Sequence, residues 1–344
     1  MKNNSSTYFL FTFGILSFIL LFGANLALGS VHIPLGEVMG WFFGQEFSKN
    51  SWETIVTEYR LPKAYTAILA GITLSISGLQ MQTFFRNPLA GPFVLGISAG
   101  AGLGVAIMMM ASSAFGWMIY SQGIGHWSTI VAASSGAILV LLMMSLMAWR
   151  VKDSMTLLIV GLMFGSAVSA VISVLAYFAE ADQLKLFTIW SMGSLGGSQF
   201  NQLWGFGFAV FLGLVPIILM LKSYNAMLLG EAYAESMGVN IKKLRWAMII
   251  STGILAGSAT AFCGPIAFIG IAVPHMARLV FKTGDHRVLF PATALIGANV
   301  LLVCDAISQL PGSAQTLPIN AVTSLVGAPM VIWLILRRNF SKEF

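Results

Sequence analysis

Residues 60–104 read RLPKAYTAILAGITLSISGLQMQTFFRNPLAGPFVLGISAGAGLG and indicate the fold class more clearly than any other stretch. Between residues 64 and 85 there is no Asp, Glu, Lys or Arg. About 20 apolar residues are enough to cross the hydrocarbon core of a bilayer as a helix. This run therefore predicts a transmembrane helix, and the Arg86-Asn87-Pro88 turn joins it to a second apolar run.

Similar apolar runs continue through the rest of the chain, of which 57% is hydrophobic and only 9% charged. So few charges could not cover the surface of a water-soluble fold of this length. The chain is predicted to be an all-α integral membrane protein, because the alternating strands of a membrane barrel are not seen. We expect one transmembrane domain over residues 1–344 with about ten spans, near residues 8–28, 64–85, 93–114, 127–149, 154–179, 201–221, 246–262, 265–279, 288–309 and 317–336.

Three segments need a decision before the spans can be counted. The first run is longer than the apolar part of an ordinary secretory signal, so we interpret it as a retained helix. Residues 186–200 are too short and glycine-rich to span, and they are predicted to form a half-helix packed inside the protein. Gly264-Pro265 should break one long helix into two, because proline cannot continue a helix interior.

The basic residues lie almost entirely on one side of a ten-span topology. Only Lys49, Arg60, Lys63 and Lys185 fall on the other side. The side rich in Lys and Arg is predicted to be cytoplasmic, and with ten spans it holds both termini. This distribution accounts for the formal charge of +6 without a nucleic-acid partner.

Glycines recur every four residues in the second apolar run, at Gly96, Gly100 and Gly104. Small residues at this spacing let helix backbones approach closely. The simplest interpretation is tight helix packing. Cys263 and Cys304 lie within apolar runs and are likewise predicted to be packing residues.

An ordered set of motifs over residues 60–330 resembles the permease subunits of ABC importers for iron-siderophore, haem and cobalamin. In the first half these are Arg60-Leu61-Pro62-Lys63, Asn87-Pro88-Leu89-Ala90 and Leu95-Gly96 followed by Gly100-Ala101. In the second half they are residues 264–270, Val273-Pro274-His275, Arg278, Asp285-His286-Arg287, Asp305, Leu317-Pro318-Ile319 and Gly327-Ala328-Pro329. The first helix and residues 29–58 lack a distinctive match.

The resemblance implies a multi-pass protein of the inner membrane that works as a dimer of permease subunits, either identical or closely related. Two ATPase subunits would bind from the cytoplasm, and a periplasmic or lipid-anchored binding protein would deliver the substrate. This chain has no G-x-x-x-x-G-K-[ST] phosphate loop, so ATP and Mg would bind to the separate ATPase. The chain itself is expected to bind no cofactor and to catalyse no reaction.

The resemblance also assigns roles to residues at the cytoplasmic side. The loop at about 222–245 would grip the ATPase, with Gly230, Glu231, Ala232 and Gly238 at its centre. An amphipathic helix lying at the membrane surface is the alternative for this loop.

The family's cytoplasmic gate maps to Asn87 and Leu89, and to Ser154 and Met155. Met155 departs from the small hydroxyl residue often found in the family. Ser154 might equally cap its helix beside Asp153.

On the outer side, the resemblance predicts that Arg60 and Lys63 pair with acidic side chains of the binding protein. Such charge pairs guide orientation and association rate more than they add affinity. The alternative is that both side chains reach toward lipid headgroups. Gln309 stands where the family often has another Arg, and Asp305 is interpreted as a polar partner at a helix end without a transport role.

Two other functional classes fit the sequence less well. A secondary transporter driven by protons or sodium would place ionisable residues deep within its spans, and here only Asp305 comes close. An intramembrane enzyme would need a catalytic constellation, and neither an H-E-x-x-H motif nor a metal-ligand cluster is present. The substrate is left open, with ferric siderophore expected first, then haem and cobalamin, and small oxyanions possible.

Overall fold

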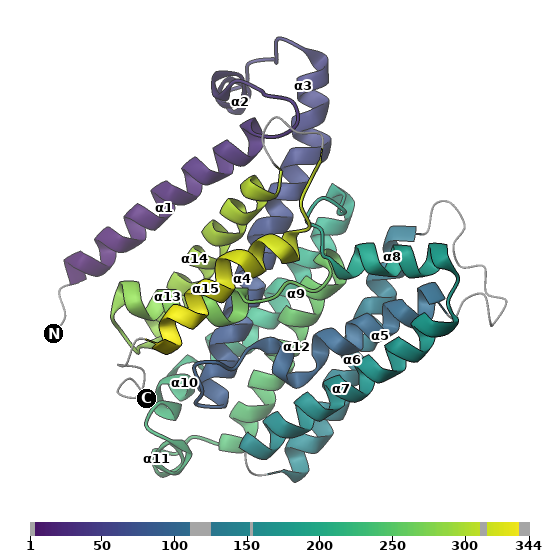
Figure 1. Cartoon of the computed structure of the whole chain (residues 1–344). Coiled ribbons are helices and arrows are strands. Elements are labelled where there is room, and N and C mark those ends of the chain that lie inside the picture. Colours follow the sequence, from purple (N-terminus) through teal and green to yellow (C-terminus); the bar gives the residue numbers. More distant parts are fainter. Residues whose placement is uncertain (1–3, 111–124, 152–153, 310–314, 337–344) are drawn as a thin grey trace.

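The computed structural model describes residues 4–110, 125–151, 154–309 and 315–336, and within these ranges the chain is helical without a β-strand. Figure 1 shows the helices packed into one bundle. In chain order the elements are α1 (Asn4–Ala27), α2 (Leu35–Phe42), α3 (Asn50–Thr54), η1 (Ile55–Arg60), α4 (Leu61–Phe84), η2 (Pro92–Leu95), α5 (Ile97–Met110), α6 (Gly125–Arg150), α7 (Ser154–Phe178), α8 (Ala181–Ser191), α9 (Phe200–Leu219), α10 (Leu221–Met227), α11 (Glu231–Ser236), α12 (Ile241–Cys263), α13 (Ile269–Phe281), α14 (His286–Ser308) and α15 (Ile319–Leu336).

Seven helical stretches among the described residues are long and apolar enough to cross a membrane: α1, the continuous α3–η1–α4 rod, α6, α7, α9, α12 and α14. Each coincides with one of the expected spans. The three other expected spans correspond to the shorter apolar helices α5, α13 and α15. The chain is therefore a multi-pass membrane protein, while the crossing by the three shorter helices stays a prediction.

Helix α4 lies at the centre of the bundle, and nearly all of its residues are buried against α12, α13 and α14. Two glycine pairs bring its backbone against its neighbours. A β carbon on Gly71 would overlap the carbonyl oxygen of Gly297 in α14, and one on Gly78 would overlap that of Gly270 in α13. The absence of side chains at these positions is what allows the close approach.

The glycine stripe predicted for the second apolar run is confirmed in part. Gly100 and Gly104 of α5 lie against the backbone of α6 at Gly136 and Ala132, where a β carbon would not fit. Gly96 is not on this face, because α5 begins one residue later. It ends η2 with a φ of +71°, a left-handed conformation that glycine adopts without steric cost.

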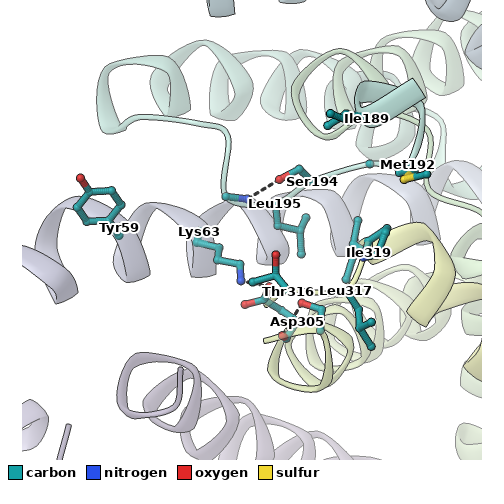
Figure 2. Close-up of a pocket in the computed structure, with 14 residues that line it drawn as sticks. Tyr59, Lys63, Ile189, Met192, Ser194, Leu195, Asp305, Thr316, Leu317 and Ile319 are labelled. Atoms are coloured by element: carbon teal, nitrogen blue, oxygen red, sulfur yellow. Dashed lines mark hydrogen bonds and ion pairs between the residues drawn. The ribbon is translucent and has the colours of Figure 1, made fainter. Parts of the chain in front are cut away.

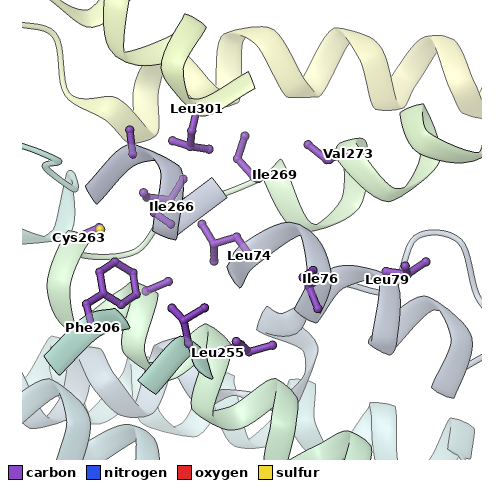
Figure 3. Close-up of a cluster of buried hydrophobic side chains, with 14 of the residues drawn as sticks. Leu74, Ile76, Leu79, Phe206, Leu255, Cys263, Ile266, Ile269, Val273 and Leu301 are labelled. Carbon is purple, nitrogen blue, oxygen red and sulfur yellow. The ribbon is translucent and has the colours of Figure 1, made fainter. Parts of the chain in front are cut away.

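Side chains from α4, α9, α12, α13 and α14 meet in a buried apolar cluster around Leu74, Phe206, Leu255, Ile269 and Leu301 (Figure 3). Cys263 lies in this cluster, and both it and Cys304 are free and buried, as expected of packing residues. The predicted break is also confirmed: α12 ends at Cys263 and α13 starts at Ile269, with Gly264 and Pro265 in the non-helical connection.

The short helix expected near residues 186–200 begins earlier, at Ala181, and its position differs from the prediction. In the single chain α8 has no buried residue, so the helical part of the expected segment does not pack inside the protein. The loop after it is inserted instead, with Gly193, Leu195 and Ser198 buried. Gly193, with a φ of +74°, lets this loop pass close to Cys263 and Ile319.

The bundle has two ends that differ in structure and charge. Figure 1 shows α2 and α3 at one end, hereafter the α2 end, and α10 and α11 at the opposite one, hereafter the α11 end. The described basic residues of the predicted cytoplasmic side lie on the helix termini and turns of the α11 end: Arg86, Arg150, Lys222, Lys242, Lys243, Arg245, Arg278, Lys282 and Arg287. Lys2, Lys152, Arg337, Arg338 and Lys342 lie outside the described residues.

Candidate functional site

A cavity of about 370 Å³ opens at the α2 end. Its walls come from the start of α4, the loop after α8, the end of α14 and the segment before α15 (Figure 2). Apolar and aromatic side chains such as Tyr59, Met192 and Leu317 line most of it, and Lys63 and Asp305 supply its charged groups. The residues of this cavity are brought together from distant parts of the sequence.

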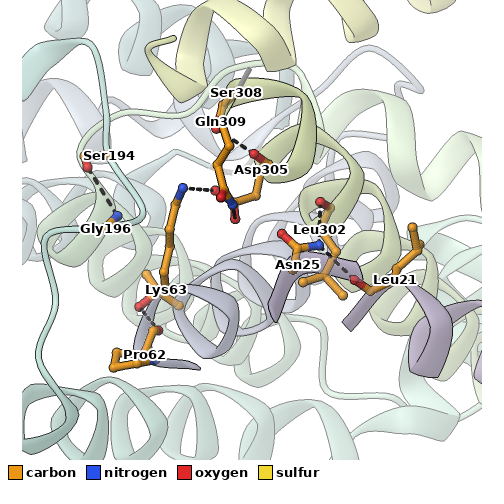
Figure 4. A network of polar contacts seen from close by, with 11 residues as sticks. Leu21, Asn25, Pro62, Lys63, Ser194, Gly196, Leu302, Asp305, Ser308 and Gln309 are labelled. Atoms are coloured by element: carbon orange, nitrogen blue, oxygen red, sulfur yellow. Dashed lines mark hydrogen bonds and ion pairs between the residues drawn. The ribbon is translucent and has the colours of Figure 1, made fainter. Parts of the chain in front are cut away.

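Lys63 and Asp305 form an ion pair, with Nζ of Lys63 2.9 Å from Oδ1 of Asp305 (Figure 4). Asp305 is 1% exposed, and the side-chain amide of Gln309 donates to its other oxygen at 3.0 Å. The expectation that Asp305 is a polar partner at a helix end is therefore confirmed. The partner of Asp305 is Lys63, one of the two residues that the resemblance assigns to docking of the binding protein.

Arg60 is bound within the chain as well. It is 7% exposed, and its guanidinium donates to the carbonyl oxygens of Leu26 and Ala27 at 2.7 and 2.8 Å, and to that of Val31. The last carbonyls of a helix lack intrahelical partners and carry partial negative charge. Arg60 thus supplies hydrogen-bond donors to the carbonyl groups at the end of α1. Its docking role and that of Lys63 stay predictions.

We expect Lys63→Met to lower the stability of the protein, because it leaves the carboxylate of Asp305 buried without its counter-ion. Removing one partner of a buried ion pair costs about 3–5 kcal/mol, and the partial exposure of Lys63 places this variant at the lower end. Thermal unfolding in detergent measures the effect. Lys185→Met, on the exposed α8, is the control, and equal melting temperatures for the two variants would contradict this reading.

At the α11 end, the expected coupling loop consists of two short helices. Gly230 precedes α11 with a φ of +105°, and Gly238 follows it with a φ of +83°. Both carboxylate oxygens of Glu231 lie within 2.7 Å of Nη2 of Arg245, which ties α11 to the first turns of α12. Ala232 is exposed on the outer side of α11.

The first predicted gate segment lies beside this loop. Arg86 has a φ of +48°, and its guanidinium lies 3.5 Å from the place where Gly230 would carry a β carbon. In the following turn the backbone N–H of Leu89 donates to Oδ1 of Asn87 at 2.9 Å, and Leu89 is 42% exposed. The structure thus places the Asn87–Leu89 turn next to the coupling loop.

The second predicted gate segment begins α7. Ser154 is the first residue of this helix, and Met155 beside it is 54% exposed. Helix α7 packs against α5 and against η2, which directly follows the Asn87–Leu89 turn. Gly96, at the end of η2, lies against Gly161 and Gly165 of α7, two to three turns after Met155. The gate roles of all four residues stay predictions.

The structure also reveals buried polar groups that the sequence interpretation missed. Tyr224 of α10 donates its hydroxyl to Oε1 of Gln80 at 2.6 Å, and both side chains are fully buried. His286, named above only as part of the Asp285-His286-Arg287 motif, is also fully buried and lies at the start of α14. The two glutamines in the apolar run 64–85 were the available signal, because a buried amide needs a partner.

Comparison with known proteins identifies the family. The model of the FecCD transport family matches residues 16–337. The chain belongs to the FecCD transport family. Relatives include the vitamin B12 import system permease proteins BtuC of Escherichia coli O17:K52:H18 and Shigella boydii serotype 18, each 35% identical. The alignments cover 86% of this chain and 88% of the first relative, and 91% and 90% for the second.

The fold of this FecCD-family chain is shared with solved transporters. It is similar to a metal-chelate type ABC transporter in an inward-facing conformation, with a TM-score of 0.79 and 25% identity over 95% of this chain and 98% of the other. A chain from PsaBC of Streptococcus pneumoniae shares the fold at a TM-score of 0.51, with 15% identity over 82% of this chain and 92% of the other.

Proposed function

We propose that this chain is the membrane-spanning permease subunit of an ATP-binding-cassette importer for a metal chelate. The FecCD match over nearly the whole chain carries the proposal, and the named relatives are permease proteins of an import system. The α10–α11 pair supports it, because a short helix held between two positive-φ glycines is a compact surface for a cytoplasmic motor. The permease itself performs no chemistry, and ATP and Mg bind to the motor.

In this proposal the α11 end faces the cytoplasm of a cell whose inner membrane holds the protein. The basic residues gathered at that end support the orientation, since loops rich in Lys and Arg remain cytoplasmic. The α2 end then faces outward and its cavity receives the substrate from a binding protein. Of the two predicted docking residues, Lys63 lines this cavity and is the one that an acidic group could reach, whereas Arg60 holds α1.

A second permease subunit, identical or closely related, completes the pathway. Large apolar side chains of α7 support this, because Leu162, Met163, Val171 and Val174 are all exposed in the single chain. Two ATPase subunits bind the two α11 ends. The turn at Asn87 and Leu89 and the start of α7 at Ser154 and Met155 close the pathway on the cytoplasmic side.

The substrate we propose first is a corrinoid, because the relatives from Escherichia coli and Shigella boydii are vitamin B12 import system permease proteins. Ferric siderophore, which ranked first from sequence alone, and haem are the next candidates.

Uptake into proteoliposomes that hold the permease with its ATPase and binding protein tests both the substrate and the energy source. We expect accumulation of cyanocobalamin that requires ATP and is lost with a hydrolysis-defective ATPase subunit. Transport of a ferric hydroxamate instead would change the proposed substrate and leave the proposed permease function unchanged. Uptake that needs no ATP and stops with a protonophore would favour a secondary transporter and contradict the proposal.

A further inference from the structure

Two branches of hydrogen bonds join α10, which directly precedes the predicted coupling helix, to the rest of the bundle. The branch that starts at Tyr224 is buried, and the one that starts at Asn225 is partly buried. Tyr224 and Asn225 are consecutive residues of α10, and they point to different partners. Tyr224 reaches Gln80 of α4, and the amide of Gln80 donates to Oγ of Ser251 in α12 at 3.0 Å. Ser251 in turn donates to the carbonyl oxygen of Gly213 in α9 at 2.5 Å.

Asn225 starts the second branch. Its Nδ2 donates to the carboxylate of Asp285 at 2.6 Å, which fixes the orientation of the amide because a carboxylate only accepts. Its Oδ1 lies 3.0 Å from Nδ1 and 2.8 Å from the backbone nitrogen of His286. Nδ1 of His286 therefore carries the proton.

The other ring nitrogen of His286 faces α4. Nε2 lies 2.9 Å from the hydroxyl of Thr83, and in the neutral ring it accepts the single proton of that hydroxyl, for which the carbonyl oxygen of Leu79, also 2.9 Å away, competes. A single direction of donation thus runs from Thr83 through His286 and Asn225 to Asp285. Burial raises the pKa of Asp285, but hydrogen bonds from the Arg287 backbone and the Asn225 amide hold this pKa below its usual value overall. The series of hydrogen bonds therefore ends on a charged carboxylate.

Thr83, Gln80, Tyr224 and His286 are all at most 2% exposed. A broken bond among them would leave a buried polar group unpaired, which is unfavourable because the group has already lost its hydrogen bonds to water. Helix α10 is therefore either joined to α4 and α14 or separated from them at a clear cost. A joined α10 moves with these helices as one body.

We propose that Tyr224 and Asn225 are positioning residues that transmit motion of the coupling helix α11 to α4 and α14. This inference rests on the proposed function and deepens it. Thr83 lies only three residues before Arg86, so a displacement of the end of α4 moves the Asn87–Leu89 turn directly. The guanidinium of Arg86 lies 3.5 Å from the β-carbon position of Gly230, so the coupling loop lies beside the same turn. Closure of the ATPase reaches the gate through this connection.

Two threonines of α4 provide a matched test. Thr83 and Thr73 are both buried, and the hydroxyl of each lies within 2.9 Å of the carbonyl oxygen four residues earlier, but only the hydroxyl of Thr83 also reaches another helix. Uptake and ATP hydrolysis are measured together in proteoliposomes for Thr83→Val, Thr73→Val and the wild type. We expect Thr83→Val to lose uptake about tenfold while hydrolysis stays within about twofold, a coupling change of the usual allosteric size. Thr73→Val should match the wild type.

A purely structural role makes a different prediction. Uptake and hydrolysis would then fall in proportion with the melting temperature, or Thr83→Val would keep the wild-type number of ATP molecules per substrate, and either result overturns the inference. If the wild type itself shows no ATP-dependent uptake, the proposed function fails instead.

A second measurement does not depend on the folding of Thr83→Val. Spin labels at Lys222→Cys in α10 and Arg287→Cys in α14 report the distance between these helices in the assembled complex, since both native cysteines are buried. The distance should be the same without nucleotide and with ATP and vanadate. A change beyond about 3 Å, larger than ordinary packed-helix shifts, would show that α10 moves apart from α14 and would overturn the inference.

Discussion

A Glu231→Arg variant should lose nearly all substrate uptake while the protein still folds and inserts. Both carboxylate oxygens of Glu231 lie within 2.7 Å of Arg245 Nη2, so the substitution replaces an attraction between α11 and α12 by repulsion between two cations. Helix α11 then loses its fixed position relative to the bundle. Uptake should fall by about tenfold or more, a change within the usual range of allosteric coupling. The measurement is ATP-driven uptake in proteoliposomes.

Two further variants show whether the internal pair is the cause. The exchange Glu231→Arg with Arg245→Glu restores the attraction and should recover much of the uptake. Glu235→Arg changes the same charge on the exposed side of α11 and should have a smaller effect. Equal damage from Glu235→Arg, or a folded but inactive exchange variant, would mean that the pair does not position α11.

Gly78→Leu should prevent recovery of a folded protein. A β carbon at this position would overlap the carbonyl oxygen of Gly270, which is backbone and cannot rotate away. Overpacking a core usually costs about 1–3 kcal/mol and more where the neighbour cannot move. Here the separation of α4 from α13 would also disturb the central helix. Size-exclusion chromatography and thermal unfolding in detergent report the loss.

Gly207→Leu is the matched control for this prediction. Gly207 lies in α9 with open space around its β-carbon position, so a side chain there starts without the backbone overlap found at Gly78. We expect a wild-type elution profile and melting temperature. A stable, monodisperse Gly78→Leu protein would contradict the close α4–α13 contact.

Local sequence patterns were sufficient to predict the long apolar helices and the break between α12 and α13. The uncharged run 64–85 predicted α4, and Gly264-Pro265 predicted the end of α12, because length, apolarity and proline act on the chain locally. Gly230 and Gly238 were recognised through the family resemblance. Their positive φ values give a physical reason for glycine at both places.

The pairing of distant residues could not be predicted in the same way. Arg60 has the sequence position of an exposed cation, yet it binds carbonyl oxygens at the end of α1, more than 30 residues earlier in the chain. The burial of His286 depends on Asn225 and Thr83, which no local pattern connects to it. Residues 186–200 were expected inside the protein as a half-helix because they are short and glycine-rich, but only the loop after α8 is inserted.

ATP hydrolysis by the complex in proteoliposomes tests the central claim most directly. Loaded binding protein should stimulate hydrolysis by wild-type complex, and Gly238→Trp should abolish the stimulation because a large side chain on the exposed coupling loop blocks the ATPase. Gly238→Asn is the control, since asparagine tolerates the φ of +83° better than other residues and adds little bulk. Stimulation in wild type and Gly238→Asn but not in Gly238→Trp is the predicted result. A chain that associates with no ATPase, and whose uptake follows an ion gradient, would contradict the account.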